Sequence, residues 1–554
     1  MDLNESSHIT IGYNVFSIPE ILGNILDLAS SQSRVEAARV CRAWSSPALD
    51  QTWREIPGVF PLLALLAPMT VADGKWGFSS DVSLADWDRF EQYARRVRIL
   101  KQLNSMHDQR VTNISEEAFA AFLLHRPEGP ILPHLKAIHC VAHKPNTLLQ
   151  LLPFATSTVT TLDVLATMGA VSTCDPFFRS LSKRLSALQV FRFDTVGQNQ
   201  QWMSSLATFL SGRESLISAI LPFSFSASAE VMKALAALPA LRECGIYTTK
   251  KHIAVEQGSP QFNWAVGAFP MLRRLHFTAS LRRAVDMLDR MEQGENLKQF
   301  IFDTTVAYSA EDIHDLAERL TRSFTALEVI SLSLFPEAAS EPIAFHSIRA
   351  LLQCPLIELS IASRTPLTTT EGDVVAMGRA WPGMTTLSLC RDPFHVAEGL
   401  GMSLQMLDVF SHHFPRLESL GVFVVDDTVS VGQGHRGGFM KLKWIDVGTS
   451  PAFDNVHMRR VQTYLSRILP GGASILATRT KGHLDLVRTN GRDRQIYAGR
   501  ADFWSGVEEG LKMIQEEKAH LLKENAQLIK ENAGLMMENA DLRCQLSVRH
   551  GGAF

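Results

Sequence analysis

The chain has 554 residues, of which 46% are hydrophobic and 20% are charged, and its formal net charge is -3. This composition is that of a folded protein, and the length allows several domains or one extended array. The small net charge gives no reason to expect a nucleic acid or an acidic membrane surface as a partner, and we predict neither.

The sequence also lacks the usual signals of secretion or membrane insertion. The first ten residues, MDLNESSHIT, are polar and do not resemble a signal peptide. The most apolar run, at 58–69, spans 12 residues and contains two prolines, so it is too short to cross a bilayer. The seven cysteines form no C-x-x-C pair, which is typical of a reducing compartment. We therefore expect a cytoplasmic or nuclear protein.

After a polar tail at 1–15, residues 16–57 carry the signals of three short helices. Capping boxes at 17–20 and 33–36 predict two helix starts, and Ser46-Pro47 predicts a third. Apolar residues at helical spacing follow each start. Three helices in so short a segment cannot build a self-sufficient core, so part of their apolar surface must be covered from outside the segment.

This segment resembles the F-box motif in the identity, order and separation of its apolar and tryptophan residues. Ile18-Pro19-Glu20-Ile21-Leu22 is followed by Ile25-Leu26, by Val40-Cys41-Arg42-Ala43-Trp44 and by Trp53-Arg54. The resemblance implies an all-α three-helix module whose apolar face docks on the Skp-type adaptor of a cullin-RING ubiquitin ligase. It covers only residues 16–57, and Ile18 stands where leucine is commoner. The residues implied to bind the adaptor are Ile18, Pro19, Ile21, Leu22, Ile25, Leu26, Val40, Cys41 and Trp44. The alternative is a helical cap on the domain that follows.

Beyond a connector at 58–90, a repeated pattern dominates residues 91–475. The motif apolar-x-x-apolar-x-apolar starts at Leu135, Val159, Leu188, Leu216, Leu241, Leu272, Leu297, Leu327, Leu356, Met384, Leu417 and Leu442. Amphipathic helical patterns lie between most of these segments, as at 230–238, 311–324 and 459–469. A strand and a helix repeated about every 28 residues predict an α/β leucine-rich-repeat solenoid. A degenerate first unit is expected near Ala94, and whether 91–134 form a complete repeat stays open.

The solvent-facing strand positions of such an array form an extended binding surface. We expect a protein target there, because arginine and tryptophan are enriched at binding hot spots. The candidates are Arg273, Arg274, His276, Trp444 and Asp446. For any one of them the simpler interpretation is a solvated strand face, and the sequence does not identify the target or any modification that it carries.

Three features that suggest catalysis or ligand binding have simpler interpretations. The segment 432–437, GQGHRG, matches a dinucleotide-binding pattern, but a predicted strand rather than a helix follows it. The histidine pair at 412–413 has no further ligand at metal-binding spacing. Cys140, Cys244 and Cys390 fall at core-facing repeat positions. We predict no enzyme, no catalytic residue, no metal and no cofactor.

We assign residues 476–504 to a linker and 505–548 to a coiled-coil-like helix. With leucine at heptad position d and asparagine at a, the predicted self-association residues are Leu521, Asn525, Leu528, Asn532, Leu535, Asn539 and Leu542. The e positions are apolar too, which widens the stripe. A homo-oligomer, a different partner protein, docking on the repeats and a frayed single helix therefore all stay open.

The order of modules resembles that of fungal F-box proteins with leucine-rich repeats. The resemblance implies a substrate-recognition subunit of an SCF-type cullin-RING E3 ubiquitin ligase, which binds the Skp-type adaptor through its F-box and a protein target through its repeats. Trp53 is then expected at the join to the repeats. The alternative is a non-ligase scaffold that uses the repeats and the C-terminal helix. An enzyme built on the solenoid would need a pocket of converging titratable groups.

Overall fold

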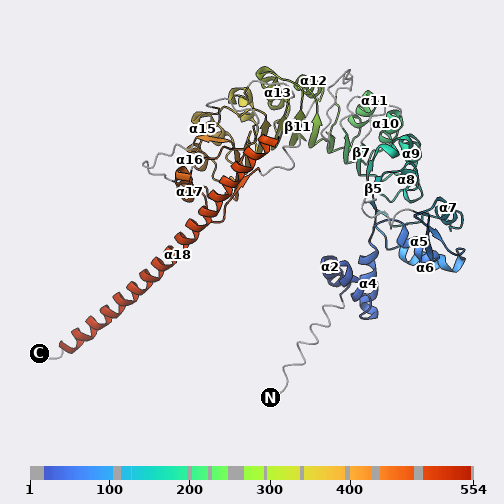
Figure 1. Cartoon of the computed structure of the whole chain (residues 1–554), viewed down its shortest axis with the longest axis horizontal. Helices are drawn as coiled ribbons and strands as arrows, with labels where there is room; N and C mark the ends of the chain where they lie inside the picture. The colour runs from blue at the N-terminus through green and yellow to red at the C-terminus, as the bar shows by residue number, and fades with distance from the viewer. Residues whose placement is uncertain are drawn as a thin grey trace, which may run out of the picture. The chain divides into compact units, whose positions relative to one another are not determined.

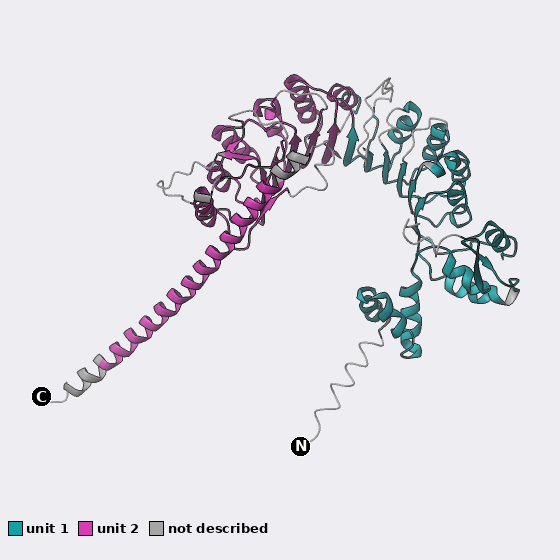
Figure 2. Ribbon diagram, in the orientation of Figure 1, with its two compact units in different colours: residues 1–278, 289–296 teal, residues 279–288, 297–554 magenta. Residues whose placement is uncertain are grey.

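The computed structural model describes residues 18–103, 114–126, 128–195, 202–222, 228–247, 267–291, 296–336, 342–393, 400–426, 437–453, 455–478 and 491–550. The chain divides into two compact units (Figure 2). Unit 1 comprises residues 1–278 and 289–296, and unit 2 comprises residues 279–288 and 297–554. In both units, parallel strands alternate with helices along the chain (Figure 1).

Unit 1 opens with three helices, α2 (Pro19–Leu28), α3 (Ser31–Ala37) and α4 (Arg42–Trp53). Their boundaries differ from the predicted ones. Helix α3 begins at Ser31, because the Ser30 hydroxyl accepts the Ser33 N–H at 3.1 Å and caps the helix one turn earlier than the box at 33–36. Pro47 lies inside α4 rather than at its start. The segment after residue 37 is therefore a turn that leads directly into one long third helix.

The predicted connector at 58–90 is folded. Short strand β1 (Glu55–Ile56) leads into α5 (Phe60–Leu66), an antiparallel hairpin of β2 (Met69–Ala72) and β3 (Lys75–Phe78), and then α6 (Leu84–Ala94). Strand β1 pairs in parallel with β4 (Ile99–Leu103), so the sheet of unit 1 begins before the predicted solenoid does.

The remaining elements of unit 1 alternate as the repeat pattern predicts. In chain order they are α7 (Glu116–Leu124), β5 (Ala137–Ala142), α8 (Pro145–Leu149), β6 (Thr161–Ala166), α9 (Cys174–Leu181), β7 (Val190–Thr195), α10 (Met203–Ser211), β8 (Ser218–Pro222), α11 (Ala229–Ala236), β9 (Glu243–Tyr247) and β10 (Arg274–Thr278). Short 3-10 helices follow α8 at Leu152–Phe154 and β6 at Met168–Thr173.

Unit 2 continues the alternation. Its elements are α12 (Leu281–Asp289), β11 (Gln299–Thr304), α13 (Ala310–Ser323), β12 (Val329–Leu334), α14 (Phe345–Ile348), a 3-10 helix (Arg349–Gln353), β13 (Glu358–Ser363), α15 (Glu371–Ala380), β14 (Thr386–Leu389), β15 (Met402–Ser403), α16 (Met406–His413), β16 (Ser419–Val422), β17 (Val424–Asp426), β18 (Trp444–Gly448), α17 (Asn455–Ile468), β19 (Ser474–Ala477) and α18 (Gly491–His550). Strands β15 and β17 form a small sheet of their own.

All twelve predicted repeat segments contain a strand, and each strand begins two residues after the first apolar residue of its segment. Alternate strand residues face the core in register, as with Leu359, Leu387 and Leu420, none of which is exposed. This alternation confirms the α/β repeat architecture, because each strand buries one face against its own helix and shares the ladder with its neighbours.

The first and last strands correct the predicted limits of the array. Ile99 pairs with Ala137, so the degenerate first unit starts at Val97 rather than at Ala94, and the buried Gln102 takes its third core position. Residues 91–134 contain both a strand, β4, and a helix, α7. At the other end, β19 adds a strand after β18 that the pattern did not predict.

Helix α18 begins at Gly491, within the segment assigned to a linker, and continues for 60 residues. Its buried residues Trp504, Val507 and Leu511 belong to the part that packs against α17 and β19. The Trp504 indole N–H also donates to the Ser450 carbonyl at 3.3 Å. From residue 516 to 542 every side chain is exposed. None of the helices that the structure describes combines the length and the apolar character needed to cross a bilayer.

Candidate functional site

The three N-terminal helices enclose a small core of their own. Leu22 and Leu26 of α2 pack with Ala37 of α3 and Ala48 of α4, and Trp44 packs against this cluster. Because Leu22 and Leu26 are only 2% and 3% exposed, they belong to the core that holds the module together. That these two leucines also contact an adaptor stays a prediction.

Hydrogen bonds from Arg34 of α3 fix the position of α2. The guanidinium donates to the carbonyl oxygens of Leu26 and Asp27, both at 2.8 Å. These carbonyls lie in the last turn of α2, where carbonyl groups lack their usual partners within the helix, although the Leu26 carbonyl also accepts the Ala29 N–H at 3.2 Å. The cation also meets the negative end of the helix dipole there. Arg34 thus joins α2 to α3 at the end of the module opposite Ile18.

Other predicted adaptor residues form an exposed apolar surface. Ile18 and Ile25 of α2 are 42% and 43% exposed, and Val40, in the turn before α4, is 64% exposed. Cys41 is exposed, whereas Ile21 and Trp44 are half-buried. Pro19 is the first helical residue of α2. We call Ile18, Ile25 and Val40 the exposed trio.

Two further exposed apolar residues on these helices were missed. They are Leu28 of α2 and Val35 of α3. Leu28 follows Ile25 by three residues, so the helical spacing already placed both on one side of α2. Five exposed apolar side chains on so small a module are typical of a protein-binding surface.

The module is joined to the elements that follow through α4. The rings of Trp53 and Tyr93 lie 4.6 Å apart between centroids, which places Trp53 at the join as predicted. Arg96 forms an ion pair with Asp50 and also donates to the Ser46 carbonyl at 3.1 Å. The three-helix module is therefore attached through α4 to the elements that follow it. The side chains of the exposed trio remain open to solvent.

The predicted target-binding residues of unit 1 lie on or beside β10. Arg274 forms an ion pair with Glu243 of the neighbouring strand at 3.1 Å, and Ser218 donates to the same carboxylate at 2.8 Å. Arg273 is exposed and His276 is half-buried. The Arg274 charge is thus already engaged across the strand ladder, and Arg273 is the more accessible cation.

The other two candidates lie together on β18 of unit 2. Trp444 is half-exposed, and its indole N–H donates to the Ser419 hydroxyl at 2.6 Å. Asp446 accepts a hydrogen bond from the Gly448 N–H at 3.0 Å and forms an ion pair with Arg391. The indole is therefore tied to the neighbouring strand β16 through Ser419, and its side chain stays 44% exposed.

A row of small residues beside Trp444 and Asp446 was not predicted. Strand register places Ser331, Ser360, Ser388 and Gly421 next to one another, and Asp446 continues the row. A side chain at Gly421 would lie 2.7 Å from the Ser388 hydroxyl oxygen, so this part of the row admits only small residues. The sequence signal was the serine at the middle solvent-facing position of successive repeats. We call Ser331, Ser360, Ser388 and Gly421 the strip; the Arg391 side chain lies against its Gly421 end, 3.3 Å from the position of an added Cβ.

A polar network closes the ends of these strands. The Asp392 carboxylate, which is buried, accepts the Thr478 hydroxyl at 2.6 Å and the Arg391 guanidinium at 3.2 Å. Arg391 thus bridges Asp392 and Asp446. Both carboxylates have hydrogen-bond donors, so the buried charge of this network is satisfied.

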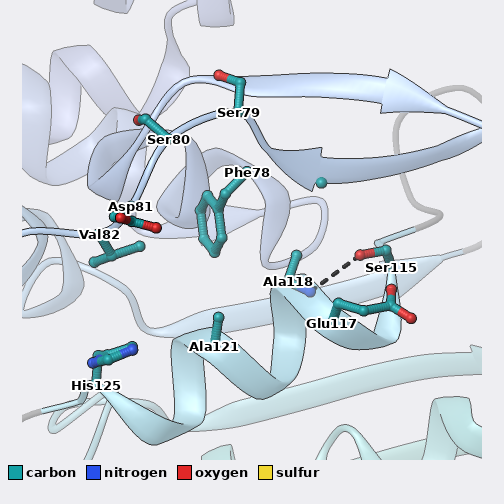
Figure 3. Close-up of a pocket in the computed structure, with 11 residues that line it drawn as sticks. Phe78, Ser79, Ser80, Asp81, Val82, Ser115, Glu117, Ala118, Ala121 and His125 are labelled. Atoms are coloured by element: carbon teal, nitrogen blue, oxygen red, sulfur yellow. Dashed lines mark hydrogen bonds between the residues drawn. The ribbon is translucent and has the colours of Figure 1, made fainter.

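A pocket of about 690 Å³ lies between the hairpin region and α7 in unit 1 (Figure 3). Phe78 points into it, and Asp81, in the segment after β3, and His125, at the end of α7, also line it. The pKa of the Glu117 carboxyl is lowered by hydrogen bonds from its own N–H and from the Ser115 hydroxyl. The hydrogen bond drawn in Figure 3 joins the Ser115 hydroxyl to the Ala118 N–H, which caps α7 and does not connect an acid with a base.

The features first considered as catalytic are placed by the structure as follows. Burial raises the pKa values of Cys140, Cys244 and Cys390 to about 12, so these thiols act as small apolar core groups. The pair at 412–413 ends α16. Among the described residues, no group of three or more His, Cys, Asp or Glu side chains could hold a metal. Residues 432–436 of the glycine-rich segment lie outside the described ranges.

Comparison with known proteins adds little. No family model and no curated protein matches the sequence. Among solved structures, the chain is similar to one described as the crystal structure of the Rad7 and Elc1 complex in yeast, with 14% identity over 80% of this chain and 98% of that chain, at a TM-score of 0.34. A likeness this weak carries no argument about fold or function.

Proposed function

We propose that the chain is the substrate-recognition subunit of an SCF-type cullin-RING E3 ubiquitin ligase. In this role the N-terminal module binds a Skp-type adaptor and through it the cullin-RING core, and the strand faces of the repeats bind a protein target. The chain itself catalyses no reaction and acts by holding the target close to the ligase. The observation that carries the proposal is the exposed trio, which lies on a module whose sequence resembles an F-box.

The exposed trio is suited to contribute binding free energy. Burying an exposed aliphatic side chain contributes about 1.5–3 kcal/mol, so three side chains about half exposed offer roughly 2–5 kcal/mol. That range is sufficient for a hot spot at the centre of a protein interface. The buried pair Leu22 and Leu26 would support the interface from beneath, because they fix the position of α2.

The test is co-purification of the full chain with a Skp-type adaptor. Val40→Asp places a charge at the most exposed member of the trio, and we expect the dissociation constant to rise at least about 30-fold, which corresponds to about 2 kcal/mol. Val71→Asp is the matched control, because Val71 lies on the hairpin strand β2 and is 56% exposed. Its binding should equal that of the unmodified chain.

Two outcomes would contradict the proposal. Folded, unmodified chain that forms no complex with the adaptor would exclude the receptor role. Equal losses in Val40→Asp and Val71→Asp would show that the interface lies elsewhere. Circular dichroism of each variant confirms that the fold is intact.

For the target face we propose the strip beside Trp444 on unit 2. Trp444→Ala removes a half-exposed aromatic ring without opening the core, so target capture should fall while adaptor binding stays unchanged. Met513→Ala, at a 70% exposed position of α18, is the comparison variant and should leave target capture unchanged. Loss of adaptor binding in Trp444→Ala would indicate a folding defect instead.

A non-ligase scaffold is the alternative function. The observation that favours it is the exposed second half of α18, which offers a second protein-binding element apart from the repeats. If the chain is a scaffold, the Val40→Asp variant should bind its partners as the unmodified chain does. If the chain is a ligase receptor, the same variant should no longer support ubiquitination of the target. Measuring target binding and target ubiquitination with the same variant therefore separates the two functions.

A further inference from the structure

The second half of α18 presents a regular apolar stripe to solvent. Its leucines at every seventh position are 51–56% exposed; they are Leu521, Leu528, Leu535 and Leu542. The residues that follow the first three of them are more exposed still; they are Leu522, Ile529 and Met536. In Figure 1 this part of α18 extends beyond the strands of its own unit. Within the described residues, nothing buries the stripe.

A helix segment of this kind needs a partner to be stable. The first half of α18 is anchored by Trp504, Val507 and Leu511. From residue 516 to 542 every side chain is exposed, whereas most of the stability of helices in proteins comes from the packing of an apolar face. Gly534, in the middle of the stripe, lowers its helix propensity further. Association that buries the leucines would supply the missing stabilisation.

We propose that a second copy of this chain covers the stripe, in a parallel, in-register, two-stranded coiled coil. The reason for a second copy lies in Asn525, Asn532 and Asn539, which occupy the a layers between the leucines. A buried asparagine is costly unless a polar group faces it. A partner must therefore carry polar groups at the same seven-residue spacing, and an identical helix in register does so in every layer. A pair of asparagines at a also favours a defined register.

The charged residues at g support the parallel orientation. Glu524, Glu531 and Glu538 occupy this position in three successive heptads. In an antiparallel pair the g rows of the two helices face each other, so glutamates would oppose glutamates, and each asparagine would meet a leucine. In a parallel pair each g residue faces an e residue of the other helix, which here is apolar. Only the parallel arrangement thus avoids both penalties.

The proposal is independent of the ligase role and is tested on the full chain. Light scattering after size exclusion, at about 10 µM, should give twice the chain mass of 61.5 kDa. Leu528→Asp places a charge in a d layer and should give the monomer mass. Met537→Asp is the matched control, because Met537 is 78% exposed and lies at f, outside the seam; it should remain dimeric.

A cross-linking experiment tests the orientation. In a chain that carries Cys41→Ser and Cys544→Ser, Asn525→Cys should form an intermolecular disulfide under mild oxidation, because residues in the same a layer meet only in the parallel register. Lys523→Cys, at f, should not. The buried cysteines of the repeats serve as an internal control for unfolding, since they should stay reduced.

Each contrary result overturns a defined part of the proposal. A monomeric unmodified chain excludes a second copy as the occupant. A mass of three or more chains excludes the two-stranded form. The apolar stripe at d and e is wide enough to explain such a higher oligomer. A dimer unaffected by Leu528→Asp would use another surface, and a dimer without the Asn525→Cys cross-link would be antiparallel or out of register. Adaptor binding should also be measured with monomeric Leu528→Asp. If this variant binds the adaptor, the N-terminal module works without the dimer, so the two proposals can fail independently.

Discussion

Replacing Gly448 by alanine is expected to disrupt the strand ends of unit 2. Gly448 ends β18 with φ of +52°, and an added Cβ would lie 2.1 Å from the Arg391 carbonyl oxygen and 2.7 Å from the Asp392 carboxylate. A side chain in this left-handed conformation costs about 1–2 kcal/mol. The overlap adds about 1–3 kcal/mol, because the Arg391 carbonyl also accepts the Thr449 N–H at 3.2 Å and cannot move freely. The expected total is roughly 2–5 kcal/mol.

Gly472→Ala separates the two contributions. Gly472 has φ of +90°, but no atom lies within 4 Å of its added Cβ. It should therefore carry only the conformational cost of about 1–2 kcal/mol. Both glycines belong to unit 2 and lie near β19 in sequence or in space, since β18 pairs with β19. The difference between the variants thus measures the overlap at Gly448.

Amide hydrogen exchange is the appropriate assay, because a repeat array need not unfold as one cooperative unit. Exchange in the peptide 444–450 should accelerate by about 30-fold or more in Gly448→Ala, which corresponds to at least about 2 kcal/mol. In Gly472→Ala the peptide around that glycine should accelerate by about 5- to 30-fold. Equal acceleration in both variants would refute the reasoning, because the close approach to Arg391 would then have no energetic effect.

Two predictions concern titratable groups. Because burial raises the pKa of Cys140 to about 12, a maleimide at pH 8 should modify the exposed Cys41 of the folded chain and reach Cys140 only after denaturation, as peptide mass spectrometry would show; early labelling of Cys140 would contradict its burial. Asp312 is partly desolvated, which opposes ionisation, but hydrogen bonds from Ser309 and Arg282 outweigh this effect and lower its pKa. Its carboxylate therefore stabilises the fold at neutral pH and loses that effect as the pH falls through the lowered pKa. Asp312→Asn should destabilise α13 by about 1 kcal/mol at pH 7, measured by amide hydrogen exchange of that helix, and the difference from the unmodified chain should shrink below about pH 4; a constant difference would contradict the assignment.

The repeat strands were predictable because their signal is local. A strand that buries one face shows apolar residues at alternate positions, whatever its neighbours are. The predicted start of the first unit was three residues too early. Ala94 is the last residue of α6, and its apolar side chain was mistaken for the first apolar position of the repeat. Only the pairing of Ile99 with Ala137 identifies Val97 as the true start. Strand pairing is a long-range contact that a single segment does not encode.

The helix boundaries depended on capping contacts that compete within a few residues. Ser30 and Ser33 are both acceptable N-caps, and the structure uses Ser30. At α18, the packing of Trp504 and Leu511 extends the helix back into the segment assigned to a linker. Tertiary burial here outweighs the low helix propensity of the glycines in that segment.

The sequence by itself determined which residues of the N-terminal module are apolar and helical, and hence that the module needs covering from outside. It did not determine which side is already covered. Leu22 lies four residues after Ile18 and three before Ile25, and Leu26 directly follows Ile25, so one broad helical stripe contains all four. The tertiary structure decides between them, because α3 and α4 can cover only part of a stripe that wide. The leucines thus became core, and the isoleucines remained available to a partner.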